Sequence, residues 1–515
     1  MTKFNLIDEH WIPCIDDSGA RVCLGVRETL QNATKLQEIC HSSPLVTASV
    51  HRFLLALLHR THGPPNDDAW GQLWRDKSWN WSALNPYMEK WYPRFELLDG
   101  SRRFYQSAYA EDAKVSPVSK LVVERASGDN KTLFDHTPSG HPLSLGEAAC
   151  YLIASQAFAV GGLITPKPGL ASHDFAQDSH LIHGAVALLR GQSLFETLML
   201  NLCTYDVSSG QPYQMDSQDR PAWEVDQGAP TKRLPRGWLD LLTWQSRRIF
   251  LYATDSSVTG VALLKGDGFP EEWHPRNAEL MVAYKKNPKA TESQDPFPPI
   301  RITEGRSLWR DSRSLFASVD GGQPIGMLRF LASRKNALGS CRLVPVDLMG
   351  VSKERAKLLL WRHERITLAT SLLSGQSGSE SSLEALRIAL DIAESIATNL
   401  RQSTWEIAKG MASMCGSSSP SSEQVRAIQA SLYEEGQYWH RLEHPFTYFM
   451  AHISGDEAKT DQAINEWVDK ASVAAKTSFR EIVGGLSASV EVLKATSRVA
   501  PKFYSQVRNV RGLST

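Results

Sequence analysis

Residues 127–169 read SGDNKTLFDHTPSGHPLSLGEAACYLIASQAFAVGGLITPKPG, and they combine two polar loops with one apolar segment. Ser144 and Glu147 have capping-box spacing just before the apolar run, which predicts a helix beginning at about residue 145. The first loop carries a single aromatic residue, Phe134, and the second begins at Gly161 and Gly162. Loops longer than about 12 residues are more often functional or disordered than plain connections. The segment therefore predicts a buried helix that holds two loops, and these loops would form a surface for a long and irregular binding partner.

The composition is that of a soluble globular protein with more than one domain. The chain has 515 residues, of which 42% are hydrophobic and 22% are charged. No apolar run approaches the ~18 residues of a membrane span, and the N-terminus lacks a signal-peptide pattern, so we expect a cytoplasmic protein without a membrane partner. The seven cysteines are scattered and form no CxxC pair, so neither a disulfide framework nor a cysteine zinc site is predicted.

The formal net charge is zero, with 56 basic and 56 acidic residues. This balance argues against a nucleic-acid-binding protein that works through its overall charge. It leaves room for local basic patches, because the stretch from Lys494 to the C-terminus contains five basic residues and no acid.

A change in composition near Arg365 predicts an α+β fold with two domains. Residues 1–364 alternate short strand and helix patterns with Trp-, Pro- and Gly-rich segments, which predicts an irregular mixed domain. Residues 365–515 show helical periodicity, which predicts a C-terminal antiparallel four-helix bundle. The expected helices of this bundle region span 365–373, 381–414, 422–442 with an extension through 445–454, 457–475 and 477–498.

Within the N-terminal part, the patterns predict a helix at 45–62 and two strands over 247–264. Residues 179–203 are predicted to be helical with a break near Gly191. Two strands, 343–349 and 357–361, are expected to flank a turn at residues 350–352.

His440, Glu443 and His444 form an H-x-x-E-H pattern, which is typical of one class of zinc hydrolase. Two histidines four residues apart share a helix face and could bind one metal ion, with Glu443 as the base. No third ligand stands out, and Pro445 is expected to distort or stop the helix. A zinc-dependent hydrolase is therefore the alternative function, and surface histidines are the simpler explanation.

Two other features allow two interpretations each. Gly161 and Gly162 permit either close backbone approach to a ligand or an ordinary helix C-cap. Lys285 and Lys286 are either a phosphate or minor-groove contact or a solvated charge pair.

Several segments resemble, in the same order, the CasA family, which is the large subunit of the type I-E CRISPR Cascade surveillance complex. FNLIDEHWIPCID at residues 4–16 is similar to that family's opening FNLIDEPWIPV, and SPVSKL at 116–121 is similar to its TPMEKL. The remaining similar segments are SGDNKTLFDHTP at 127–138, AFAVGGLIT at 157–165, EEWHPRNAELMVAYKK at 271–286 and LWRHERITL at 360–368.

The resemblance implies a non-catalytic subunit without metal or cofactor. Such a subunit would recognise the protospacer-adjacent motif (PAM) in duplex DNA from the minor groove, help to start strand opening, and recruit the helicase-nuclease. The implied partners are the backbone, 5′-handle and small subunits of Cascade, CRISPR RNA, double-stranded target DNA and the helicase-nuclease. A basic side of the bundle would hold the displaced strand or the duplex.

The resemblance also implies two sets of site residues. A loop that contacts the complex's backbone near the guide-RNA handle would consist of Asn130, Lys131, Thr132, Leu133 and Phe134. The DNA-contacting set would consist of Gly161, Gly162, Leu163, Lys285, Lys286, Lys353, Arg355 and Ala356. One of the two lysines would be the family's lysine finger.

The chain departs from the family pattern at two places. The family's wedge is built around a glutamine, whereas residues 350–358 contain none, and Arg355 takes its place in the alignment. Leu163 stands where a third glycine is expected.

A scaffold that binds only protein partners is a further alternative for the function of this chain.

Overall fold

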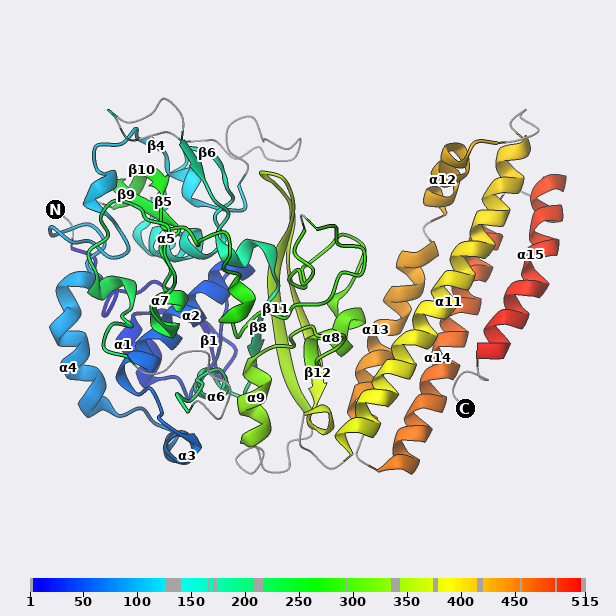
Figure 1. Cartoon of the computed structure of the whole chain (residues 1–515), viewed down its shortest axis with the longest axis horizontal. Coiled ribbons are helices and arrows are strands. Elements are labelled where there is room, and N and C mark those ends of the chain that lie inside the picture. Colours follow the sequence, from blue (N-terminus) through cyan, green and yellow to red (C-terminus); the bar gives the residue numbers. More distant parts are fainter. Residues whose placement is uncertain are drawn as a thin grey trace. The chain divides into compact units, whose positions relative to one another are not determined.

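The computed structural model describes residues 3–125, 140–164, 167, 169, 174–206, 216–254, 256–292, 294–334, 343–373, 378–414, 420–432, 434–453, 456–486 and 489–510. The chain forms two compact units (Figure 1), one of residues 1–340 and 344–366 and one of residues 341–343 and 367–515. Small sheets and helices mix in the first unit and helices make up most of the second, so the predicted α+β class is confirmed.

The strands of the first unit form small, separate sheets. They are β1 (Ile12–Asp16), β2 (Arg21–Leu24), β3 (Leu36–Ile39), β4 (Ser116–Pro117), β5 (Leu143–Ser144), β6 (Gly162–Ile164), β7 (Asp174–Ala176), β8 (Val186–Leu189), β9 (Arg247–Ala253), β10 (Ser257–Lys265), β11 (Leu343–Glu354) and β12 (Lys357–Ala369). The sheet orders are β2-β1-β3, β4-β10-β5 with β9 also paired to β10, β12-β11-β8, and the two-stranded β6-β7.

The helices of the first unit are mostly short. They are α1 (Val26–Gln31), α2 (Pro44–Thr61), α3 (Asp67–Asp76), α4 (Trp81–Trp91), α5 (Leu145–Phe158), α6 (Leu194–Leu200), α7 (Trp238–Leu242), α8 (Ser312–Phe316) and α9 (Met327–Ser333).

Helix α2 forms the centre of this unit, with α5 and α7 packed against it (Figure 1). It begins at the expected place, because Ser43 caps it and Pro44 occupies the first turn, where a missing N–H is tolerated. Most of its residues are buried, including Arg52, whose Nη1 lies 2.9 Å from Oε1 of the buried Glu279. A buried charge needs such a partner, so this ion pair lets α2 carry an arginine through the core.

Helix α5 confirms the predicted capping box. The Glu147 amide donates to Ser144 Oγ at 3.2 Å, and the Ser144 amide donates to Glu147 Oε2 at 3.1 Å. The helix ends at Phe158, and the chain continues through residues 159–161 into the β6–β7 hairpin. A buried helix therefore sets the position of the glycine-containing loop.

The prediction of a helix over residues 179–203 is wrong for its middle part. The chain forms a 3₁₀ turn, η5 (His180–His183), then β8, then α6. Val186 pairs with Met349 of β11, so a short apolar run that local periodicity could not classify became a buried strand.

The predicted turn at residues 350–352 is also wrong, because β11 continues to Glu354 and the turn consists of Arg355 and Ala356. Gly350 lies inside the strand. A Cβ added there would lie 2.8 Å from the Gly184 carbonyl oxygen, so the glycine marks a close approach between backbones.

The second unit consists mainly of long helices. They are α11 (Ser379–Met414), α12 (Ser422–Ser431), α13 (Glu434–His452), α14 (Glu457–Gly484) and α15 (Val490–Asn509). Helix α11 packs along α14 and α15, and α13 packs along α14, consistent with the predicted bundle (Figure 1).

Four local predictions in the second half of the chain are wrong. Residues 422–442 do not form one helix, because α12 ends at Ser431 and α13 begins at Glu434. Residues 365–369 belong to β12 and not to a helix, because they extend a strand that is paired with β11. The predicted break at residue 476 is absent, since α14 runs on to Gly484 with Phe479 buried. Helix α13 continues through Pro445, where buried Phe446 and Phe449 pack on Trp467 and outweigh the lost backbone hydrogen bond.

Among the described residues, no helix combines the length and apolarity needed to cross a bilayer.

Candidate nucleic-acid interface

The loop that carries Gly161 and Gly162 is anchored by hydrogen bonds on three consecutive residues. The Ser179 amide donates to the Ala159 carbonyl at 2.9 Å. The buried Arg247 donates from Nη2 to the Val160 carbonyl at 3.0 Å. The Gly161 amide donates to Asp178 Oδ1 at 2.7 Å. The loop is therefore held in one conformation before any ligand arrives.

Gly161 and Gly162 differ in what a side chain would meet at each position. A Cβ added at Gly161 would lie 2.7 Å from both the Ala176 carbonyl oxygen and the Asp178 nitrogen, so this glycine is required for packing within the chain. Gly162 has a φ of +147°, and a Cβ added there would have no heavy atom of the described residues within 4 Å, so its backbone faces open space. Of the two, only Gly162 leaves room for a ligand to approach the backbone closely.

Leu163 follows as the most exposed large apolar residue of this hairpin. Its side chain is 79% exposed, and it pairs across the strands with Phe175, which is 63% exposed. Residues directly opposite each other in an antiparallel pair project from the same face. The β6–β7 hairpin thus presents an apolar pair beside the open glycine.

Arg355 and Ala356 form the exposed turn between β11 and β12. Arg355 has a φ of +52°, a left-handed conformation that residues other than glycine rarely adopt. Lys353 Nζ donates to the Arg355 carbonyl at 3.1 Å and also lies 2.7 Å from Asp178 Oδ2. The Lys353 side chain is only 13% exposed, so its ammonium group is engaged within the protein.

Asp178 is the common partner of the glycine loop and the hairpin. Burial disfavours its charged form, but hydrogen bonds from His183, Lys353 and the Gly161 amide hold the pKa of Asp178 well below its ordinary value. Sequence reasoning missed this residue, as well as Phe175. Asp178 lies 17 positions from Gly161 and 175 positions from Lys353, so no local pattern could have identified it.

The two lysines of the expected finger differ in their partners. Lys285 Nζ lies 2.8 Å from Asp311 Oδ1, and this ion pair contributes to holding the pKa of Asp311 below its ordinary value despite burial. Lys286 is exposed and forms no ion pair within the described residues. The solvent-facing cation of the pair is therefore Lys286.

Gly184 packs close to the segment before Lys285 and to strand β11. A Cβ on Gly184 would lie 2.7 Å from Val282 Cγ1, three residues before Lys285, and a Cβ on Gly350 of β11 would lie 2.8 Å from the Gly184 carbonyl. Gly184 directly follows His183, whose Nε2 lies 3.1 Å from Asp178 Oδ2.

The expected handle-contact residues lie outside the described residues. They are Asn130, Lys131, Thr132, Leu133 and Phe134.

Comparison with known proteins identifies the family. The sequence profile of the family described as CRISPR-associated protein Cse1 matches residues 5–477. A CasA/Cse1 protein from Thermus thermophilus is 31% identical over 524 residues, covering 98% of this chain and 97% of the relative. This chain belongs to the Cse1 family. The predicted relationship to the large subunit of type I-E Cascade is confirmed.

Solved structures share the fold of this Cse1 family member. The crystal structure of CasA from Thermus thermophilus has a TM-score of 0.82 at 28% identity, covering 98% of this chain and all of that one (100%). A chain in a structure described as a CRISPR RNA-guided surveillance complex has a TM-score of 0.75 at 17% identity, covering 98% of this chain and 100% of that one. The similarity to the surveillance-complex chain shows only that the two chains share a fold.

The second unit of this Cse1 family member contains a cleft of about 740 Å³ lined by α11, α12 and α15. Gly410 of α11 allows the close approach of α15, because a Cβ there would lie 2.8 Å from Ala495 Cβ. The lining side chains include one acid, Glu406, and Trp405, together with the cations Arg401, Lys409, Arg426, Arg498 and Lys502. The last four cations form no ion pair within the described residues, which makes the cleft electropositive.

The H-x-x-E-H residues do not form a metal site. His440, Glu443 and His444 are exposed on α13, and the His440 side chain is 82% exposed with its Nδ1 3.5 Å from Glu443 Oε2. The described residues contain no group of three or more histidine, cysteine or acidic side chains placed to hold a metal ion. The zinc-hydrolase alternative is therefore not favoured.

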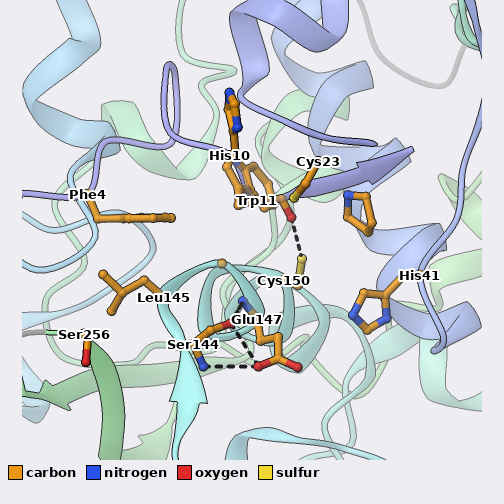
Figure 2. Close-up of a pocket in the computed structure, with 12 residues that line it drawn as sticks. Phe4, His10, Trp11, Cys23, His41, Ser144, Leu145, Glu147, Cys150 and Ser256 are labelled. Atoms are coloured by element: carbon orange, nitrogen blue, oxygen red, sulfur yellow. Dashed lines mark hydrogen bonds between the residues drawn. The ribbon is translucent and has the colours of Figure 1, made fainter. Parts of the chain in front are cut away.

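A separate pocket of about 530 Å³ lies where α5 begins, between that helix and the N-terminal sheet (Figure 2). Figure 2 shows Ser144 and Glu147 of the capping box on one side and Trp11 with Cys23 on the other. Cys150 Sγ donates to the Trp11 carbonyl at 3.4 Å, and burial raises the pKa of this thiol. A thiol that stays protonated is a poor nucleophile, so Cys150 is not a candidate for covalent catalysis.

Proposed function

We propose that this Cse1 family member is the DNA-reading subunit of a type I-E Cascade complex and acts by binding, not by catalysis. The observation that carries this proposal is a set of three features, of which the first two are joined through Asp178. These are the open backbone at Gly162, the exposed hairpin turn at Arg355 and Ala356, and the exposed Lys286. Together they offer close backbone approach, a charged tip and a solvent-facing cation.

These features suit the minor groove of duplex DNA. The groove is about 6 Å wide and distinguishes mainly A·T from G·C pairs, so a glycine backbone and a lysine give tolerant reading of a short PAM. Leu163 and Phe175 supply an apolar surface of the kind that minor-groove proteins place against base steps and sugars. Sequence specificity beyond the PAM would come from pairing between guide RNA and target strand.

Arg355 is the proposed wedge that helps to start strand opening. Its exposed position at a two-residue turn supports this assignment, because a long cationic side chain on a rigid hairpin can enter beside a base pair and hold a phosphate. Lys353 has a supporting place in the same hairpin, and Ala356 offers a small side chain where the backbone turns.

The electropositive cleft of the second unit is the proposed site for the displaced strand or the adjoining duplex. Its cations supply phosphate contacts, and Trp405 on its wall offers an aromatic surface. The remaining Cascade subunits, CRISPR RNA and a helicase-nuclease are the proposed partners in antiviral defence in the cytoplasm. Membership of the Cse1 family supports this proposal.

The test is binding of the reconstituted RNA-containing complex to duplexes in which the guide-matched target carries a randomised flanking triplet. We expect a triplet preference that appears only when this chain is present. An identical preference without the chain would contradict the DNA-reading role and favour a scaffold that binds only protein partners.

A further inference from the structure

We propose that Asp178 is a positioning residue that fixes the glycine loop and the β11–β12 hairpin relative to each other, so that both meet DNA as one rigid surface. This inference rests on the proposed function and adds to it a residue that does not itself contact DNA. Asp178 precedes η5 directly after the β6–β7 hairpin, and its carboxylate is mostly buried.

The two carboxylate oxygens of Asp178 have separate tasks. Oδ1 accepts the Gly161 amide at 2.7 Å and so holds the glycine loop. Oδ2 lies 2.7 Å from Lys353 Nζ and 3.1 Å from His183 Nε2, and so holds the hairpin and the start of the next segment. One side chain thus links elements that are far apart in the sequence.

Lys353 extends this link to the tip of the hairpin. Its ammonium group donates to the Arg355 carbonyl at 3.1 Å, next to a backbone that has a φ of +52°. A non-glycine residue keeps this conformation only where its surroundings hold it. The series of contacts that begins at Gly161 therefore ends at Arg355, the residue proposed as the wedge. Lys353 would thus influence DNA binding by holding Arg355 in place.

A fixed spacing matters because the DNA groove is narrow. Gly162 and Arg355 would have to reach neighbouring base pairs at the same time, and a groove about 6 Å wide tolerates little independent movement of the two elements. Loss of the link would let the elements engage DNA separately. Binding to DNA in general would persist, while discrimination between flanking triplets would fall.

Asp178→Asn is the informative variant. The remaining carbonyl oxygen of Asn can still accept the Gly161 amide, but its amide group then faces the Lys353 ammonium, donor against donor. We expect the discrimination between preferred and disfavoured triplets to fall roughly tenfold in the reconstituted complex, the size expected for one hydrogen bond to a charged group. The affinity for DNA without a target should stay unchanged.

Asp174→Asn is a matched control. Asp174 lies on β7 of the same hairpin, its side chain has the same 26% exposure as Asp178, and it binds Lys265 Nζ at 2.8 Å in place of Lys353. Lys265 lies outside both the glycine loop and the β11–β12 hairpin, so substitution of Asp174 should leave discrimination intact. Lys353→Met breaks the link from the other side and covers the case in which the Asp178 variant fails to fold.

The double variant Asp178→Asn with Lys353→Met should lose no more discrimination than either single variant, because both break one link. Equal discrimination in the Asp178→Asn, Lys353→Met and unsubstituted complexes would overturn the inference, as would equal losses for Asp174→Asn and Asp178→Asn. If the unsubstituted complex itself shows no triplet preference that depends on this chain, the proposed function fails first, and the two failures are thereby distinguished.

Discussion

Adjacent residues can have different roles when only one of them has a partner inside the chain. Lys285 is paired with Asp311, whereas Lys286 faces solvent. An ammonium group already held by a carboxylate has less to gain from a DNA contact than a solvated one. The sequence alone gives no reason to prefer Lys285 or Lys286 as the DNA contact. The fold creates the difference, because only Lys285 has a carboxylate partner.

Lys286→Ala should weaken binding of the complex to target DNA by about 1–3 kcal/mol and reduce the salt dependence by about one charge. Lys285→Ala should have the smaller effect, because its side chain is already engaged with Asp311. Titrations at several salt concentrations measure both quantities, and Lys289→Ala, an exposed lysine nearby, is the control. A larger loss for Lys285→Ala than for Lys286→Ala would reverse the assignment of the finger.

Glu124 gives a residue-scale prediction on pH. It accepts a hydrogen bond from Ser43, the N-cap of α2, and burial raises its pKa to about 7 from an ordinary 4.5. Since the folded chain holds this proton more tightly than the unfolded chain, the associated stability is full below about pH 4.5 and is lost as pH rises through about 7.

Glu124→Gln removes this ionisation. The variant should be more stable than the unsubstituted chain at about pH 8, by roughly 3 kcal/mol at most, and the difference should shrink toward about pH 5. Urea unfolding across this range measures it. Glu9→Gln, at an exposed position, should leave the pH dependence unchanged, and an equal effect of both substitutions would contradict the role of burial.

At the scale of elements, α13 shows tertiary packing overriding a local signal. Pro445 lacks an N–H and its ring crowds the preceding turn, yet the helix continues from Glu434 to His452. Buried residues on both sides of the proline keep the helix in place, including Leu442, Phe446 and Phe449. The helix therefore carries a local cost that packing offsets.

Pro445→Ala should raise the free energy of unfolding by about 1–3 kcal/mol, because alanine restores the missing hydrogen bond and is the best helix former. Thermal or chemical unfolding of the full chain provides the measurement. Pro44→Ala is the control, because Pro44 sits in the first turn of α2, where proline is favourable, and this substitution should bring no gain.

At the scale of the whole molecule, a zero net charge coexists with a local electropositive cleft. The 56 basic and 56 acidic residues cancel overall, but the cleft is lined by five cations and one acid. Electrostatic attraction to DNA depends on how charge is distributed over the surface and not only on its sum. Neutrality of the chain is thus compatible with a phosphate-binding surface.

Arg498→Ala combined with Lys502→Ala should weaken binding of the complex to its DNA target and lower the salt dependence by about two charges, without changing the preferred triplet. Lys494→Ala with Arg508→Ala is the control, because these exposed cations of α15 are not among the cleft residues. Equal losses for both pairs would indicate attraction to the whole helix and would contradict a specific role of the cleft.

Much of the architecture follows from short-range patterns. The capping box at Ser144 and Glu147, the buried helix at 44–61, the hairpin at 247–265 and most of α11 depend on neighbours within a few residues, and these predictions were confirmed. The family was also recognisable, because its matching segments occur in the same order along the chain. Local sequence was enough wherever one helix face or one strand pair determined the structure.

Tertiary contacts decided the rest. The strand at Val186–Leu189 and the position of the hairpin turn depend on pairing with β11, which no local period encodes. In the candidate DNA interface, the sequence and its family resemblance predicted Gly162 and Arg355 as site residues but gave no sign of Asp178, which joins their segments from distant positions. Hydrogen bonds across such separations arise only when the backbone has already folded, so their partners are set by three-dimensional packing and cannot be deduced from spacing.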